Sequence, residues 1–272
     1  MRPLAVLVPL VILAGCLAPP VPDPDPGTAL ASVLPWTLNE CRYIVGWSEA
    51  DPAIVQSNLP EGFTVQTGRP LGLPLPEQAA RVIIGTEAFE CASGSGLDGT
   101  VEPMSYASIW IPVTPPDAFV DPDIDEVYYK IHVLIPDAPR REAMRALGLS
   151  VGAGEIAWTQ PPVPDSMGAE FTIEGAGDFA FELLAPRAAA AGDGFPFMEI
   201  TPAGENGADG FAVWKADYAW DGDSYWRGNG FITWPAGHWV TDAIGAERAP
   251  GTFHAGVWSF DGTLTLPSTP VG

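Results

Sequence analysis

The sequence predicts a mainly β fold, an antiparallel barrel or sandwich with a few short helices packed on it. Runs rich in β-branched and aromatic residues, separated by Gly, Pro, Asp and Asn, recur from residue 81 onward, and this is the pattern of successive strands joined by turns. A helical period of 3.6 residues is confined to two short segments. Many strands with so few helices favour a closed or sandwiched sheet.

The N-terminal segment resembles the signal of a prokaryotic lipoprotein. Arg2 precedes an apolar run of ten residues, Leu4–Leu13, which is too short for a hydrocarbon core that needs about 20 residues. Ala, Gly and Cys16 follow, so the segment is similar to a lipobox. The resemblance implies a signal peptide over 1–15, lipid on Cys16, and anchoring to the membrane outside the cytoplasm. An ordinary secretory signal, with Cys16 an incidental small residue, is the alternative.

A tether and one domain are expected after the signal. Residues 16–34 comprise Cys16 and a proline-rich spacer, since Leu17–Gly27 is dense in proline and poor in apolar residues, a composition that stays extended. Residues 35–272 are enough for a single β-rich domain. The chain is 47% hydrophobic and has ten Trp, which fits a packed core and not a disordered chain.

The chain is strongly acidic. Its net charge of -22 comes from 34 acidic and 12 basic residues, and its only lysines are Lys130 and Lys215. Such a field repels nucleic acid and anionic lipid head groups, so we expect neither as a partner. Either the acidity is the halophilic composition of proteins from salty habitats, where salt screens self-repulsion, or it serves a cationic partner or ligand.

Two cysteines remain once Cys16 is lipidated. In an oxidising compartment Cys41 and Cys91 predict a disulfide, and two buried free thiols are the alternative. A metal site is not expected, because two cysteines without nearby His or Cys cannot complete a tetrahedral shell. No phosphate-cradling glycine loop or other cofactor motif occurs, and we expect no cofactor.

Two short helices are predicted from their end signals. Asp51 and Pro52 provide an N-cap and a first-turn proline, and this helix must end before Pro60. Asp137 caps a second helix, which Gly148 terminates.

The strands are predicted from β-rich runs bounded by turn residues. The expected strands are Arg81–Cys91, Met104–Val113, Val127–Ile135, Glu155–Thr159, Ala169–Ile173, Phe179–Leu184, Gly210–Tyr218, Ser224–Thr233, His254–Phe260 and Thr263–Leu266.

The strand Val127–Ile135 carries the best candidates for chemistry. Alternate residues share a face, so Tyr128, Lys130 and His132 are expected to point the same way. If that face meets a cavity, a desolvated Lys130 with a lowered pKa could form a Schiff base with a carbonyl ligand, and Tyr128 or His132 could move protons. If the face meets solvent, the three residues are ordinary surface groups.

Glu87 and an aromatic stretch are further candidates. Glu87 shares a strand face with Ile83, Phe89 and Cys91. It is an inward carboxylate with a functional role, or else an edge-strand residue or a member of a simple salt bridge. Residues 214–227 interleave Trp and Tyr with Asp and Arg. Such a stretch could form a sugar-binding surface, or its rings could be core.

The run Trp47–Phe63, with Leu-Pro-Glu-Gly near its end, resembles the opening of proteins with the acetoacetate decarboxylase-like fold. The resemblance covers roughly Cys41 to Leu266 and implies a cone-like closed antiparallel sheet. Those decarboxylases carry a Schiff-base lysine in a Gly-x-Pro-Lys-like segment after the later helix. This chain has Gly148–Gly154 there, without a lysine, so the resemblance does not carry the catalytic mechanism across.

Three functions follow as expectations. The first is an anchored extracytoplasmic lipoprotein that binds a small or apolar ligand in a barrel cavity without catalysis. The second is a decarboxylase-like enzyme acting on carbonyl or carboxylic acid compounds, with Lys130 as nucleophile. The third is a carbohydrate-binding surface module.

Overall fold

The computed structural model describes residues 33–67, 82–95, 101–159, 167–189, 195–204 and 210–266. The expected signal peptide, Cys16 and all but the last residues of the expected tether lie outside the described residues. In the described part of the chain, no helix is both long and apolar enough to cross a membrane.

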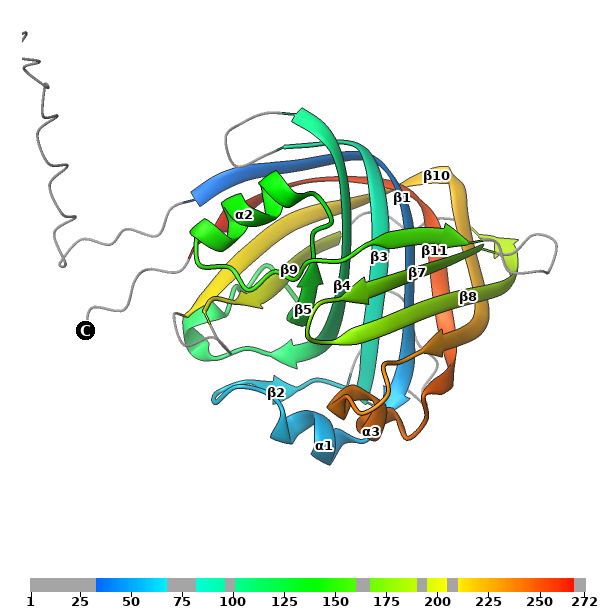
Figure 1. The fold of residues 1–272 in the computed structure, drawn as a ribbon. Helices are drawn as coiled ribbons and strands as arrows, with labels where there is room; N and C mark the ends of the chain where they lie inside the picture. Colours follow the sequence, from blue (N-terminus) through cyan, green and yellow to red (C-terminus); the bar gives the residue numbers. More distant parts are fainter. Residues whose placement is uncertain are drawn as a thin grey trace, which may run out of the picture.

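The described strands form a closed, mixed barrel of seven strands (Figure 1). Around the barrel the order is β1, β3, β4, β5, β9, β10 and β11, and β11 pairs with β1 to close it. Every barrel pairing is antiparallel except that of β5 with β9, which is parallel. The barrel strands are β1 (Val33–Ala50), β3 (Val82–Ser95), β4 (Val101–Thr114), β5 (Glu126–Leu134), β9 (Phe195–Pro202), β10 (Phe211–Thr233) and β11 (Arg248–Thr265).

A second layer of strands branches from the barrel. The first half of β10 pairs with β9, whereas its second half pairs with β8 (Gly177–Ala188). β7 (Met167–Ile173) and β6 (Ile156–Thr159) continue from β8, and the short β2 (Thr64–Val65) pairs with β4. The long, bent β10 therefore belongs to both layers.

Strand alternation separates two hydrophobic cores. On β4, Tyr106 and Trp110 face the barrel interior, while Ile109 and Ile111 face outward. The outward core packs against β7, β8 and the helices α1 (Pro52–Ser57) and α3 (Trp239–Ile244), which lie side by side (Figure 1). The interior core includes Met144 of α2 (Ala138–Ala146). Because successive side chains point to opposite faces, each barrel strand supplies both cores.

The two predicted helices are present with the predicted caps. The Asp51 carboxylate accepts from the amides of Ala53 and Ile54 at the start of α1, and that of Asp137 accepts from Arg140 at the start of α2. Helix α3 and a 3-10 turn over Asp117–Phe119 were not expected. Helix α3 spans only six residues, too few for a helical period to stand out.

The strands confirm the mainly β, barrel-like prediction but differ from it in several elements. The sequence reasoning missed β1, the two-residue β2 and β9. In β1 the alternation of Trp36 and Leu38 is interrupted by a bulge before Cys41, where Glu40 has a φ of 50°. The expected pairs of strands in 210–233 and 254–266 are the single strands β10 and β11.

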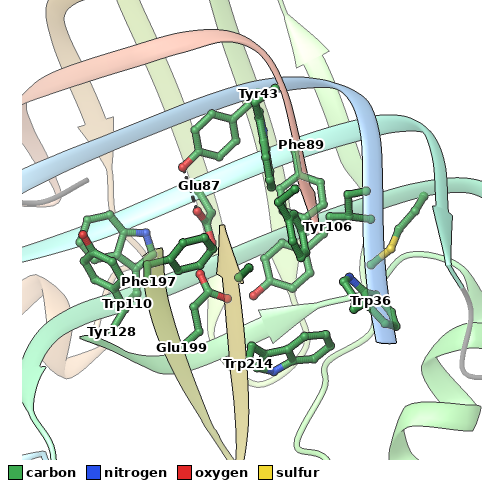
Figure 2. Close-up of a pocket in the computed structure, with 15 residues that line it drawn as sticks. Trp36, Tyr43, Glu87, Phe89, Tyr106, Trp110, Tyr128, Phe197, Glu199 and Trp214 are labelled. Carbon is green, nitrogen blue, oxygen red and sulfur yellow. Dashed lines mark hydrogen bonds between the residues drawn. The ribbon is translucent and has the colours of Figure 1, made fainter. Parts of the chain in front are cut away.

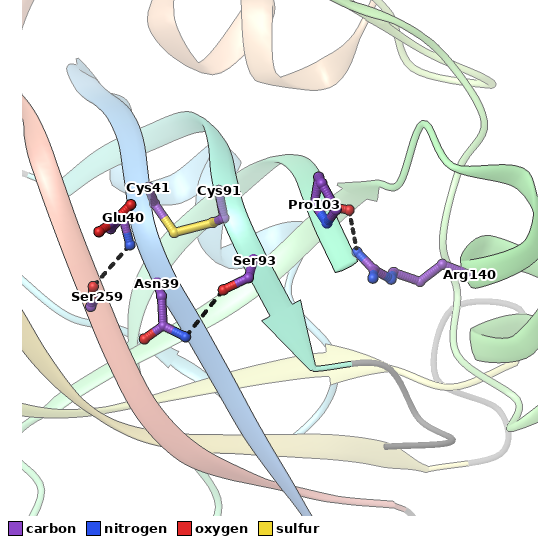
Figure 3. Close-up of a disulfide and its surroundings, with 8 residues drawn as sticks. All are labelled: Asn39, Glu40, Cys41, Cys91, Ser93, Pro103, Arg140 and Ser259. Carbon is purple, nitrogen blue, oxygen red and sulfur yellow. Dashed lines mark hydrogen bonds between the residues drawn. A yellow bond between two sulfur atoms is a disulfide. The ribbon is translucent and has the colours of Figure 1, made fainter. Parts of the chain in front are cut away.

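Cys41 and Cys91 form a disulfide, as predicted. They are direct partners in the register of β1 with β3, and Figure 3 shows the bond bridging the two strands. Nearby, Glu40 donates its amide to the Ser259 hydroxyl on β11, at 3.0 Å. Arg140 of α2 donates to the carbonyl of Pro103 on β4, at 3.3 Å. At this part of the barrel the disulfide therefore joins β1 to β3, and hydrogen bonds join β1 to β11 and α2 to β4.

Candidate functional site

Four neighbouring barrel strands place polar side chains in a row on the interior face. Glu87 on β3 pairs with Ser108 on β4. Lys130 lies on β5, and Glu199 on β9 is the register partner of Tyr128. Since the strands are adjacent in the barrel, their inward side chains meet.

Lys130 is the centre of this row. Its side chain has no exposed surface, and its Nζ pairs with the carboxylates of both Glu87 and Glu199, the latter at 2.5 Å. It also donates to Ser108 Oγ at 3.0 Å, and it lies 5.6 Å from the centre of the Tyr106 ring. A buried ammonium is tolerable only with such partners, because burial otherwise removes its hydration without replacement.

Glu87 has three hydrogen-bonding partners. Besides the pair with Lys130, its Oε1 accepts from Ser108 Oγ at 2.6 Å, and its Oε2 accepts from the Tyr43 hydroxyl at 3.0 Å. It is 6% exposed and lies on a strand paired on both sides. Glu87 is therefore an inward carboxylate and not an edge-strand residue, and it also forms a salt bridge, which is buried.

These carboxylates face a partly open cavity inside the barrel (Figure 2). The space open to the centres of water molecules is about 50 Å³, enough for roughly three to five waters at about 10–15 Å³ each. Ten aromatic side chains line it together with Glu87, Glu199 and three aliphatic residues. The aromatic residues are Trp36, Tyr43, Phe89, Tyr106, Trp110, Tyr128, Phe197, Trp214, Trp258 and Phe260.

The ammonium is charged in this setting. Burial by itself lowers the pKa of Lys130, but the carboxylates of Glu199 and Glu87 outweigh burial and hold that pKa above its ordinary value. This differs from the lowered pKa that the Schiff-base hypothesis requires. Tyr106 also stays protonated, because burial raises the pKa of its phenol.

Glu199 is the titratable group of the cavity. Burial is the main cause that raises the pKa of Glu199 to about 7. The charge of Lys130 acts in the opposite direction, and the charge of Glu87 adds to the increase. Its side chain keeps 18% of its surface accessible and lines the cavity. A carboxyl with a pKa near neutrality can gain or lose a proton at physiological pH, which suits either proton transfer or exchange of the proton for another cation.

Tyr128 lines the cavity with its ring but directs its hydroxyl elsewhere. The ring packs edge-to-face on Trp110, with centroids 4.8 Å apart, and the hydroxyl donates to Glu126 at 2.5 Å. Tyr128 and Glu87 thus line the same cavity, and Lys130 lies behind its wall, paired with Glu87.

The prediction that His132 shares this face was wrong. Trp110 pairs with Lys130 and Ile109 pairs with His132, so Ile131 is an extra residue in a β-bulge. The extra residue reverses the alternation beyond it. His132 therefore points away from the cavity and meets His238, with the two Nε2 atoms 3.0 Å apart. Burial, aided by His238, lowers the pKa of His132 to about 4.

Sequence reasoning missed Glu199, Ser108 and Tyr106. The signal for Glu199 was the alternation in residues 197–200, where Phe197 and Glu199 face the cavity and Met198 and Ile200 face the outer core. The strand Met104–Val113 was predicted, and the alternation of side chains along it could have placed Tyr106 and Ser108 on one face.

The aromatic stretch over 214–227 is partly internal where its side chains are described. Trp214 is half-buried and lines the barrel cavity, and Tyr225 is buried with its hydroxyl against His254. Trp226 is half-buried. Among the described residues, no group of three or more His, Cys, Asp or Glu is arranged to hold a metal ion.

Comparison with known proteins shows the fold. No family model and no curated protein matches the sequence. The acetoacetate decarboxylase of Legionella pneumophila has a similar structure, with a TM-score of 0.53 and 12% identity over 88% of this chain and 87% of that chain. Another acetoacetate decarboxylase gives 0.52 and 14% over 86% and 88%. The enduracididine biosynthesis enzyme MppR with HEPES buffer bound gives 0.51 and 13% over 88% of each chain.

This chain therefore has the acetoacetate decarboxylase-like fold, at low sequence identity. The segment after α2, where the resemblance implies a catalytic lysine, contributes Leu149 and Val151 to the interior core. The amide of Ser150 donates to the carbonyl of Pro202 after β9. The lysine of this cavity instead comes from β5, between two carboxylates.

Proposed function

We propose that this chain is a membrane-anchored extracytoplasmic lipoprotein that binds a small ligand inside its barrel, without catalysis. One observation carries the binding proposal: a mainly aromatic cavity inside the barrel contains a few polar groups at one wall. Binding sites for small molecules have this composition, since apolar walls supply affinity and a few polar groups fix orientation.

The state of Lys130 favours binding over covalent chemistry. A Schiff base needs an unprotonated amine that can reach a carbonyl carbon. The two carboxylates keep Lys130 protonated. Among the described residues, Glu87 and Glu199 line the cavity, whereas Lys130 does not. The ammonium supports the wall of the cavity from behind.

A decarboxylase-like enzyme is the second candidate, because one observation favours it. Lys130 lies beside Glu199, whose pKa of about 7 would let it accept a proton from the ammonium when a carbonyl ligand arrives. Lys130 would then be the nucleophile and Glu199 the proton acceptor.

Borohydride trapping separates the two candidates. The full chain is incubated with acetoacetate and sodium borohydride, and intact and peptide masses are measured. We expect no reduced adduct on Lys130. An adduct there would support the enzyme and overturn the non-catalytic proposal.

Binding itself is measured by tryptophan fluorescence with 3,3-dimethylbutan-1-ol and choline as small probes. Four Trp line the cavity, so an occupant changes their emission. Ala216, which lines the cavity, is replaced in Ala216→Phe to fill it, and the exposed Ala157 is replaced in the control Ala157→Phe. We expect a response that Ala216→Phe abolishes and Ala157→Phe retains. If neither probe changes the wild-type emission, the binding proposal fails.

A further inference from the structure

We propose that the occupant of this cavity is a small organic cation, an alkylated or methylated ammonium, held by the aromatic walls and the carboxylates of Glu87 and Glu199. This inference rests on the proposed binding function and names its ligand class. Three features carry it: the kind of wall, the balance of charge, and the size of the space.

The walls are those that attract cations. Ten aromatic rings surround the space, and four of them are indoles. The face of an aromatic ring is negative, and an ammonium within about 6 Å of its centre is attracted, most strongly by Trp and most of all where water is excluded. In Figure 2 Trp110 and Tyr128 lie to one side of the carboxylates, and Trp36 and Trp214 to the other.

The cavity wall carries more negative than positive charge when both of its carboxylates are ionised. With both carboxylates ionised, Glu87 and Glu199 supply two negative charges and Lys130 supplies one positive charge. A second cation in the cavity would balance the group. An anionic ligand would instead add a third negative charge, and a neutral ligand would leave either a proton on Glu199 or one carboxylate uncompensated.

In the empty cavity a proton can take the place of that cation. Glu199 is faced by Lys130 from β5, Glu87 from β3 and Tyr106 from β4, and β10 contributes the uncharged Trp214 and Ala216. Burial among these groups raises the pKa of Glu199 to about 7, so the carboxyl is partly protonated at neutral pH. Binding of an organic cation then displaces the proton.

The size of the space fits a compact head group. Room for roughly three to five waters suits a trimethylammonium or a short alkylammonium and excludes a long peptide or an oligosaccharide. The net charge of the whole chain, -22, also raises the local concentration of cations and speeds their approach.

The decisive experiment compares two ligands of the same shape. Choline carries a trimethylammonium, and 3,3-dimethylbutan-1-ol carries a neutral tert-butyl group in its place. Calorimetric titration of the full chain at pH 8 and low salt is expected to give choline an affinity about tenfold higher or more, as for a desolvated cation among aromatic rings. Equal affinities, or tighter binding of the alcohol, would overturn the cation inference while leaving cavity binding intact. Binding of neither would remove both proposals.

The pH dependence of binding to the wild-type protein provides a second test, for which Glu199→Gln is the control. Choline affinity is expected to fall by about tenfold from pH 8 to pH 6, because protonation of Glu199 removes its charge over this range. The affinity of the neutral alcohol should stay unchanged. In Glu199→Gln the pH dependence of choline binding should disappear, and the advantage of choline over the alcohol should shrink to what Glu87 and the aromatic rings supply. A choline affinity that is flat in pH would contradict the exchange of proton for cation.

Discussion

At the scale of single residues, the two lysines of the chain occupy opposite environments. Lys130 is fully buried between two carboxylates, whereas Lys215 forms an ion pair with Asp121 in which its side chain is 42% exposed. Removing one partner of a buried ion group leaves a charge without solvation, but removing one partner of an exposed pair returns the other to water.

This contrast predicts different costs for the same substitution. Lys130→Met leaves Glu87 and Glu199 facing each other in a dry cavity, and we expect a loss of about 3–5 kcal/mol in the free energy of unfolding at pH 8. The loss should be smaller at pH 6. A carboxyl whose pKa is higher in the folded than in the unfolded protein lowers the free energy of unfolding as the pH rises and the group ionises.

Urea unfolding followed by circular dichroism measures this effect. The control Lys215→Met should change stability little, since its pair is exposed. If both variants lose the same small amount, or if the loss in Lys130→Met grows toward acid pH, the buried ion group is not what stabilises this wall.

At the scale of elements, pairing and bulges decide which side chains meet. The disulfide joins adjacent strands β1 and β3 and closes a separation of 50 residues. The chain between the two cysteines includes α1 and β2. A crosslink over this length restricts the unfolded chain far more than the folded one.

We therefore expect the double variant Cys41→Ser/Cys91→Ser to lose about 4 kcal/mol of unfolding free energy on the chain-entropy model. Urea titration measures the loss, and wild-type protein treated with dithiothreitol should show the same shift. The reductant should have no effect on the double variant. An unchanged midpoint in the wild type under reduction would mean that the crosslink contributes nothing.

At the scale of the whole molecule, the proposed anchor and the barrel are separate parts of one function. A single acyl chain binds membranes only marginally, whereas the several chains of a lipoprotein cysteine hold firmly. A proline-rich spacer would then keep the barrel clear of the bilayer.

The anchor predicts where the full chain is found in a bacterial cell. Wild-type protein is expected in the membrane fraction and should incorporate labelled palmitate, and Cys16→Ser should move it to the soluble fraction without the label. Cys41→Ser/Cys91→Ser is the matched control, since it removes two cysteines without touching the lipobox. Lipid-free wild-type protein would contradict the anchor.

The sequence by itself determined the mainly β class, most strand positions, the caps of two helices and the cysteine pairing. These depend on local rules, because period 2, turn residues and capping groups act over a few residues.

Only the tertiary structure decided what surrounds Lys130. Barrel closure through the parallel pairing of β5 with β9 brings Glu199 to the ammonium, and one extra residue at Ile131 turns His132 away. Local periodicity in the sequence predicts neither which distant strands pair nor where a bulge lies, since both depend on how the whole sheet closes. The sequence left Lys130 as either a nucleophile or a surface group, and barrel closure buries it as a charged residue between two carboxylates.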